Sequence, residues 1–251
     1  MNLSSTFIFQ VDISMKKFLL VLTPLFTLTA CGSVAIMDKS EVVSKQPQLI
    51  IKTDGDFWGL GQEGTFDIAG MYQGKYSRNS SSSTWFDTVS FKDGELAAEI
   101  TRNDNGQMWN LICSGGGTSV NYMGVDFGGN KPYRCSVTQR NEKVGEFVLE
   151  PQSGMIKVSL ENKEAGYIRV GSNKYDVETV HSSKDLLMSV EKPLGYSFKQ
   201  ASQEAAAAQT NGMLTLQMMP ELNDDEKDTL VIGTIASALS HNTIVCMWHR
   251  S

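Results

Sequence analysis

The sequence ELAAEITRNDNGQMWNLIC, residues 95–113, contains two apolar-rich runs on either side of the polar segment Asn103–Gly106. Asn and Gly tolerate the positive φ angles that tight turns between antiparallel strands require, so they mark a turn here. The stretch therefore predicts a β-hairpin, with one strand over residues 95–101 and the other over residues 108–113.

Turns of the same kind occur on both sides of this hairpin. Residues 85–91 (WFDTVSF) are followed by Lys-Asp-Gly at residues 92–94, and Asp-Gly is typical of tight hairpin turns. Further along, the runs 167–170 and 175–180 flank Gly-Ser-Asn at residues 171–173 and predict another hairpin. We therefore expect successive antiparallel hairpins.

Short strand-like runs continue over most of the chain, with turn residues about every 8 to 12 positions. This spacing leaves no room for crossover helices and argues against parallel βαβ units. We predict a mainly β fold, either an antiparallel sandwich or a barrel-like sheet. The other runs lie at residues 49–52, 65–71, 134–137, 144–149, 155–160 and 213–218.

The segment EAAAAQ at residues 204–209 permits two interpretations. Ala is the best helix former, but six residues do not hold a helix alone in water. The turn Asn211-Gly212 and the apolar run after it favour a hairpin, so we predict a strand.

Residues 223–240 predict a C-terminal amphipathic α-helix. Asn223 or Asp224 can cap its first turn, where further acidic residues suit the helix dipole. One apolar stripe is expected to pack on the sheet. Its members are Leu230, Val231, Ile235, Ala238 and Leu239.

The composition is that of an ordinary globular protein, with 41% hydrophobic and 20% charged residues among 251. The 28 acidic residues outnumber the 22 basic ones and give a formal net charge of -6. A general affinity for nucleic acid is therefore not expected. We predict a single β-rich domain over residues 48–251.

The N-terminal region has the composition of an export signal. Met15-Lys16-Lys17 precedes thirteen uncharged residues, FLLVLTPLFTLTA, at positions 18–30. A membrane-spanning helix needs about 20 apolar residues, so this run is too short to span a bilayer. A basic start followed by a short apolar run is typical of a signal peptide, here residues 15–30. Residues 1–14 precede this complete signal, and we expect Met15 to be the true start.

The end of this signal, Leu28-Thr29-Ala30-Cys31, resembles the lipobox of bacterial lipoprotein precursors. The resemblance implies cleavage before Cys31, acylation of Cys31 with fatty acids such as palmitate, and attachment to a membrane of the cell envelope. Gly32, rather than Asp, after the acylated residue implies the outer membrane in a Gram-negative cell. The resemblance leaves open whether the protein faces the periplasm or the surface. Residues 31–47 are then expected to form a lipidated tether.

Three cysteines follow Cys31. In an oxidising periplasm Cys113 and Cys135 are the natural disulfide pair, because a bond between them closes a Gly-rich loop. The alternative is that both are buried free thiols. Cys246 is expected to be a packed apolar thiol, since no partner for catalysis is identifiable.

No motif predicts a catalytic residue, a metal site or a cofactor. Gly115–Thr118 lacks the Lys of a phosphate-binding loop. The oxygen-rich segments 54–56 and 104–105 do not extend to a calcium-binding loop, and they are expected to be turns. The three histidines are scattered along the chain, which argues against zinc.

Five aromatic residues of the first half of the chain are candidates for a binding surface. Aromatic side chains beside short polar residues suit contact with a saccharide or a protein. The alternative, which strand alternation favours, places them in the β core. They are Trp58, Tyr72, Tyr76, Trp85 and Trp109.

We expect a non-catalytic structural or binding role at the cell envelope, with membrane attachment through the N-terminal lipid. An envelope protein or a saccharide is the candidate partner. One alternative is an envelope hydrolase that acts on peptidoglycan or polysaccharide through a carboxylate pair. Another is an assembly or secretion accessory that docks a partner protein through the C-terminal helix or an exposed sheet edge.

Overall fold

The computed structural model describes residues 34–54, 63–78, 96–115, 120–122, 125–127, 132–152 and 162–240. The proposed signal peptide, its lipobox, Cys31 and Cys246 lie outside these residues. So do Trp58, Trp85, and the predicted strands at 85–91 and 155–160.

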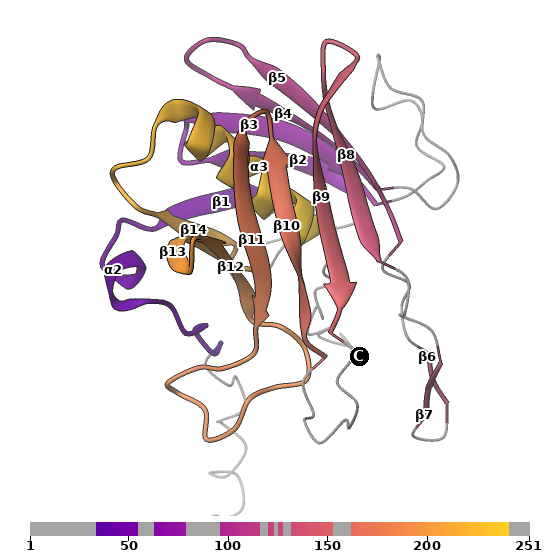
Figure 1. Ribbon diagram of the computed structural model, residues 1–251, viewed down its shortest axis with the longest axis vertical. Helices are drawn as coiled ribbons and strands as arrows, with labels where there is room; N and C mark the ends of the chain where they lie inside the picture. The colour runs from indigo at the N-terminus through magenta and orange to yellow at the C-terminus, as the bar shows by residue number, and fades with distance from the viewer. Residues whose placement is uncertain are drawn as a thin grey trace, which may run out of the picture. The chain divides into compact units, whose positions relative to one another are not determined.

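Twelve antiparallel strands form one closed barrel, in the order β1-β14-β13-β12-β11-β10-β9-β8-β5-β4-β3-β2 (Figure 1). A separate two-stranded ribbon, β6 (Val120–Tyr122) and β7 (Val125–Phe127), lies in the excursion between β5 and β8. The barrel strands are β1 (Leu49–Thr53), β2 (Glu63–Ile68), β3 (Tyr72–Ser77), β4 (Leu96–Arg102), β5 (Met108–Ser114), β8 (Tyr133–Gln139), β9 (Glu142–Pro151), β10 (Glu164–Val170), β11 (Asn173–Val180), β12 (Gly195–Gln200), β13 (Gln203–Gln209) and β14 (Thr215–Met218).

The mainly β prediction is confirmed, and the sheet is a barrel rather than a sandwich. The hairpin at residues 95–113 is the pair β4 and β5, with Gly106 at φ +69° in its turn. The hairpin at 167–180 is the pair β10 and β11, with Gly171 at φ +57°. The segment 204–209 belongs to β13, so the strand interpretation is also confirmed.

Most apolar residues of the strands point inward. In β11, for example, Tyr175 and Val177 are buried, whereas Lys174, Asp176 and Glu178 alternate with them on the outside. This two-residue period places one continuous apolar core inside the barrel.

The two ends of the barrel differ. The tight turns β2–β3, β4–β5, β8–β9, β10–β11 and β12–β13 lie together at what we call the turn end, because neighbouring strands run antiparallel. The longer β11–β12 connection, residues 181–194, lies at the opposite end, which we call the loop end. Figure 1 shows this connection in orange below the barrel.

The C-terminal helix α3 (Asp224–Ser240) lies inside the barrel (Figure 1). Every residue from 228 to 239 is buried, and the helix contacts β4, β10, β11, β12 and β14. The predicted C-terminal helix is therefore confirmed, but the barrel surrounds it, and the expectation that one apolar stripe packs on a sheet is corrected. Its buried hydroxyls are satisfied within the helix: Thr234 donates to the carbonyl of Leu230, and Ser237 donates to that of Gly233.

Both ends of α3 are capped. At the turn end, Asn223 Oδ1 accepts from the amide of Glu226, and the Glu226 carboxylate accepts from the amide of Asn223. This reciprocal pair is a capping box, so Asn223 is the cap. At the loop end, the Arg78 guanidinium donates to the carbonyl of Ala238, where the helix dipole favours a cation.

Residues 35–47, which we call the strap, pack on the outside of β13 and β14. The short helix α2 (Glu41–Ser44) lies within the strap. Met37 and Val43 are buried in a small cluster with Leu194 and Ala207. From residue 35 onward, the expected tether is therefore part of the folded domain.

The predicted disulfide is confirmed. Cys113 on β5 and Cys135 on β8 are bonded and occupy paired positions in the sheet. Both are buried. The bond closes the base of the excursion that carries β6 and β7.

Candidate functional site

A cavity of about 670 Å³ lies at the turn end, between the β4–β5 and β8–β9 hairpins. It forms because the two hairpins separate. The last paired residues of β5 and β8 are Asn110 and Thr138, whereas Met108 still pairs with β4 and Gln139 with β9. The strands therefore leave a gap beyond Asn110, and the side chains around this gap form the cavity walls.

Carboxamides dominate the lining of this cavity, which we call the amide pocket. A carboxamide both donates and accepts hydrogen bonds without a charge. Arg140 adds a cation and Met108 adds an exposed apolar surface. The lining residues are Asn105, Gly106, Gln107, Met108, Asn110, Gln139, Arg140 and Asn141.

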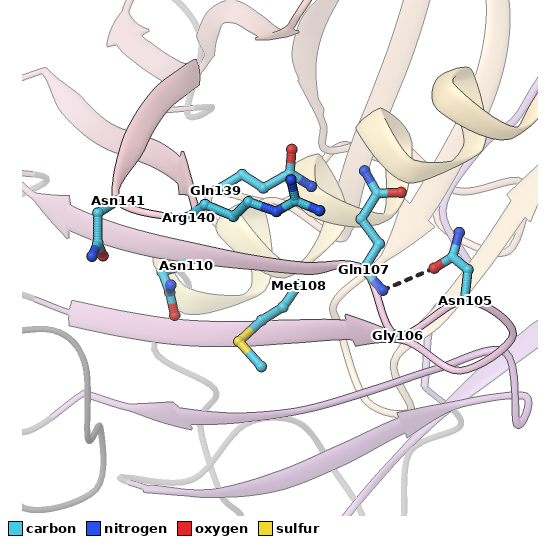
Figure 2. Close-up of a pocket in the computed structure, with 8 residues that line it drawn as sticks. All are labelled: Asn105, Gly106, Gln107, Met108, Asn110, Gln139, Arg140 and Asn141. Carbon is cyan, nitrogen blue, oxygen red and sulfur yellow. Dashed lines mark hydrogen bonds between the residues drawn. The ribbon is translucent and has the colours of Figure 1, made fainter.

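The side chains of the two hairpins approach one another across the gap. Figure 2 shows Gln139 and Arg140 extending toward Gln107, whereas Asn141 points away. Asn105 Oδ1 accepts a 2.8 Å hydrogen bond from the amide of Gln107 and so stabilises its own turn. The facing carboxamides and guanidinium can therefore contact one small ligand from two sides.

Asn110 lines the amide pocket beside Met108, and Figure 2 shows both side chains extending from β5 away from Gln139 and Arg140. Asn110 is only 7% exposed, and its Oδ1 has no hydrogen-bond partner among the described residues. A buried acceptor without a partner is unfavourable, because it has lost water without replacement. A donor group of a ligand in the pocket can satisfy it.

The β8–β9 turn positions Arg140 by its backbone geometry. Arg140 and Asn141 both have positive φ, at 50° and 66°. This is the geometry of a tight primed turn, which matches the twist of the two strands. The Arg140 side chain consequently leaves the turn on the side of the pocket.

A second, shallower hollow of about 580 Å³ lies on the outside of β1 to β4. Its carboxylates already have partners: Asp54 accepts from the amide of Thr65, Asp67 from that of Gly70, and Glu99 lies 3.7 Å from Lys75. These contacts stabilise turns and strand pairs. The hollow therefore has fewer free polar groups to offer a ligand than the amide pocket.

Polar groups inside the barrel hold α3. Tyr133 donates a 3.1 Å hydrogen bond to the carbonyl of Ala236, and burial raises the pKa of its hydroxyl. At the turn end, Arg102 lies 2.8 Å from Asp224, and this contact lowers the pKa of Asp224. These groups are engaged with the helix rather than with a cavity.

The structure separates the aromatic residues that the sequence suggested for binding. Tyr72, Tyr76 and Trp109 are all buried inside the barrel. They therefore form no exposed contact surface, and the core interpretation holds for them. Trp58 and Trp85 lie outside the described residues.

Sequence reasoning missed the residues of the amide pocket. The sequence predicts a turn at Asn105 in preference to a calcium-binding loop, and Gln107, Asn110 and Gln139 carry no motif. The one available signal was the density of carboxamides around the predicted turn at 103–106. Their convergence with Arg140 depends on the pairing of β5 with β8, which no local pattern encodes.

Within the described ranges, no group of three or more His, Cys, Asp or Glu residues is placed to hold a metal ion. None of the helices that the structure describes is both long and apolar enough to cross a bilayer. Comparison of the chain with known protein families, curated proteins and solved structures found no match.

Proposed function

We propose that the protein is an envelope lipoprotein, anchored by acylated Cys31, that binds a saccharide in the amide pocket. The observation that carries the proposal is the buried Oδ1 of Asn110, which lines the pocket and has no partner among the described residues. The residues that line the pocket with Asn110 can hold and orient a ligand by hydrogen bonds, and none of them is a carboxylate or a histidine that would exchange protons with it. The role is therefore binding rather than catalysis.

The chemistry of the lining suits a saccharide. Each sugar hydroxyl can both donate and accept hydrogen bonds, and so can each carboxamide. Met108 can contact the apolar face of a sugar ring, and Arg140 can bind a carboxylate on an acidic sugar by a charge-assisted hydrogen bond. Soluble peptidoglycan fragments combine both features and are the first ligands to test.

The position of the pocket supports binding away from the anchor. The strap begins beside Asn211, whose side chain donates to the carbonyl of Ala35 at the loop end. The pocket lies at the turn end, and β5 is six places from β13 in the twelve-strand order, which is half of the circumference. A lipid on the N-terminal side of the strap therefore leaves the pocket accessible.

The test is a calorimetric titration of the mature chain with soluble peptidoglycan fragments, and with maltotetraose as an uncharged comparison. Asn110→Ala is expected to weaken binding about 10-fold, the equivalent of about 1.4 kcal/mol for one hydrogen bond. Arg140→Gln is expected to weaken binding of the acidic fragments alone. Gln73→Ala, a carboxamide change in the second hollow, is the matched control and is expected to leave both affinities unchanged.

Thermal unfolding of each variant verifies that the fold is retained, which we expect for Asn110→Ala because its Oδ1 has no partner to lose. Absence of binding by either ligand, or equal binding by wild type and Asn110→Ala, would refute the saccharide proposal.

The alternative of a docking accessory requires an exposed C-terminal helix or an exposed sheet edge, and the described residues offer neither. The helix α3 is enclosed, and the closed barrel has no open edge. The alternative of a hydrolase finds no carboxylate in the amide pocket, and the carboxylates of the second hollow are engaged. Neither alternative has a specific observation in its favour.

A further inference from the structure

Three consecutive apolar residues project into solvent from the β11–β12 connection. Leu187 is fully exposed, Met188 is 74% exposed, and Leu186 is 36% exposed. Single exposed apolar residues are common on protein surfaces, but a run of three at a loop tip is not. We call these three residues the apolar tip.

The connection that carries the apolar tip is ordered at its base. The amide of Val190 donates to the carbonyl of His181, and the His181 ring pairs with the carbonyl of Val190 at 2.9 Å. Within the loop, the amide of Leu186 donates to the carbonyl of Ser183. The base is thus closed, and the tip is held away from the barrel core.

The apolar tip lies at the end of the barrel where the described chain begins. The amide of Asp38 donates a 2.9 Å hydrogen bond to the carbonyl of Ser182, in the same connection. Val34 and Ile36, at the start of the described chain, are also exposed apolar residues. Figure 1 shows the strap starting beside the orange connection.

We infer that the apolar tip inserts into the surface of the lipid bilayer to which the N-terminus is attached. The inference rests on the proposed acylation of Cys31. Only two residues, Gly32 and Ser33, lie between Cys31 and Val34, and the three residue steps from Cys31 to Val34 span at most roughly 10 Å. The acyl chains therefore hold the loop end at the bilayer surface, where exposed Leu and Met side chains leave water for the acyl boundary.

The charges of the β11–β12 connection determine whether insertion of the tip depends on the headgroup charge of the lipids. Lys184 and Lys192 flank the apolar tip, but Asp185 and Glu191 balance them. The loop has no net charge, so insertion depends on apolar contact and not on anionic headgroups. Vesicles of phosphatidylcholine and vesicles containing phosphatidylglycerol are expected to give the same result.

The test places a fluorophore on the tip of the full, acylated protein. Leu187→Cys is made in a Cys246→Ser background, labelled with an environment-sensitive dye and reconstituted into phosphatidylcholine vesicles. Ser172→Cys, in the tight β10–β11 turn at the turn end, is the matched control. Brominated acyl chains are expected to quench the dye at position 187 and to leave the dye at position 172 unchanged.

Three results would overturn the inference. If brominated lipid quenches the dye at position 187 no more than the dye at position 172, the tip lies in water. The dye at position 187 could instead emit as in an apolar environment already in detergent, with no change on reconstitution into vesicles. That result would place the tip against protein, such as residues 241–251 or a partner. A mass spectrum without acyl chains on Cys31 would remove the anchor and the inference together, whereas the saccharide titration would still test the pocket separately.

Discussion

The hydroxyl of Tyr72 donates a 2.6 Å hydrogen bond to Oδ1 of Asp228, and both residues are almost completely buried. The bond joins β3 to the second turn of the enclosed helix. Burial raises the pKa of Asp228, while the contacts with Tyr72 and Arg102 act in the opposite direction. Hydrogen bonds from Tyr72 and Arg102, two side chains of the barrel wall, therefore offset the cost of burying the Asp228 carboxyl group.

Tyr72→Phe is expected to lower the free energy of unfolding by about 1 to 3 kcal/mol, because the Asp228 carboxyl loses a partner while it stays buried. Urea unfolding followed by circular dichroism measures this change. Tyr167→Phe is the matched control, since Tyr167 donates to Glu146 at 2.8 Å on the outer surface, where water replaces the hydroxyl. Equal losses in the two variants would show that burial of the Asp228 pair is unimportant.

Glu164→Gln is expected to raise the melting temperature at neutral pH. Burial raises the pKa of Glu164 above its ordinary value of 4.5, so the folded state binds this proton more tightly than the unfolded state does. The stability from the neutral form is complete below pH 4.5 and is lost as the pH rises through the raised pKa.

The difference between wild type and Glu164→Gln is therefore expected to disappear below pH 4.5. Thermal unfolding over a pH series measures it, and Glu142→Gln, at an exposed position, serves as the control. A variant that is less stable than wild type at neutral pH would contradict the expectation.

Reduction of the Cys113–Cys135 bond is expected to lower the free energy of unfolding by about 3 kcal/mol, because the two cysteines are 22 positions apart and the open loop regains entropy when the chain unfolds. Thermal unfolding with and without reductant measures the loss. Cys246→Ser keeps the bond and is expected to respond to reductant as wild type does. Alkylation of Cys113 and Cys135 without reductant would show that the bond does not form.

Met37→Ala is expected to release the strap without unfolding the barrel, because Met37 is buried in the small cluster with Leu194 and Ala207, which is separate from the core inside the barrel. Limited proteolysis with mass analysis should show faster cleavage within residues 34–47 while residues 162–240 stay protected. Val42→Ala, at a half-exposed neighbouring position, is the control. Simultaneous loss of strap and barrel would mean that the two fold as one unit.

Local chemistry was sufficient to predict some elements. Gly106 and Gly171 mark the two hairpins that were found, because Gly adopts positive φ without steric cost. Other tight turns were missed, since non-Gly residues adopt the same geometry there. These turns contain Ala69, Ala201 and Ser202, and Arg140 and Asn141 have the same geometry at the break predicted between residues 137 and 144. Such residues reach positive φ only because the paired strands on either side enforce it, and this is a property of the whole sheet.

Closure of the barrel and burial of α3 were beyond local patterns. The alternating strands agree equally with a sandwich and with a barrel, because both bury one face of each strand. The inward residues of β13 are Ala206 and Ala208, which belong to the same core cluster as the buried residues of α3. No local pattern in the Ala run indicates that a helix occupies the lumen. The amide pocket was likewise unpredictable, since it depends on where the β5–β8 pairing ends.

The pairing of β1 with β14 has a consequence for how the protein is made. Leu49 lies opposite Leu216, and the core is complete only when residues up to 240 have entered the barrel. A chain that emerges N-terminus first from a ribosome or an export pore therefore cannot finish folding until almost all of it has emerged. During that interval its apolar strand faces are uncovered, so folding must outpace aggregation or rely on chaperones.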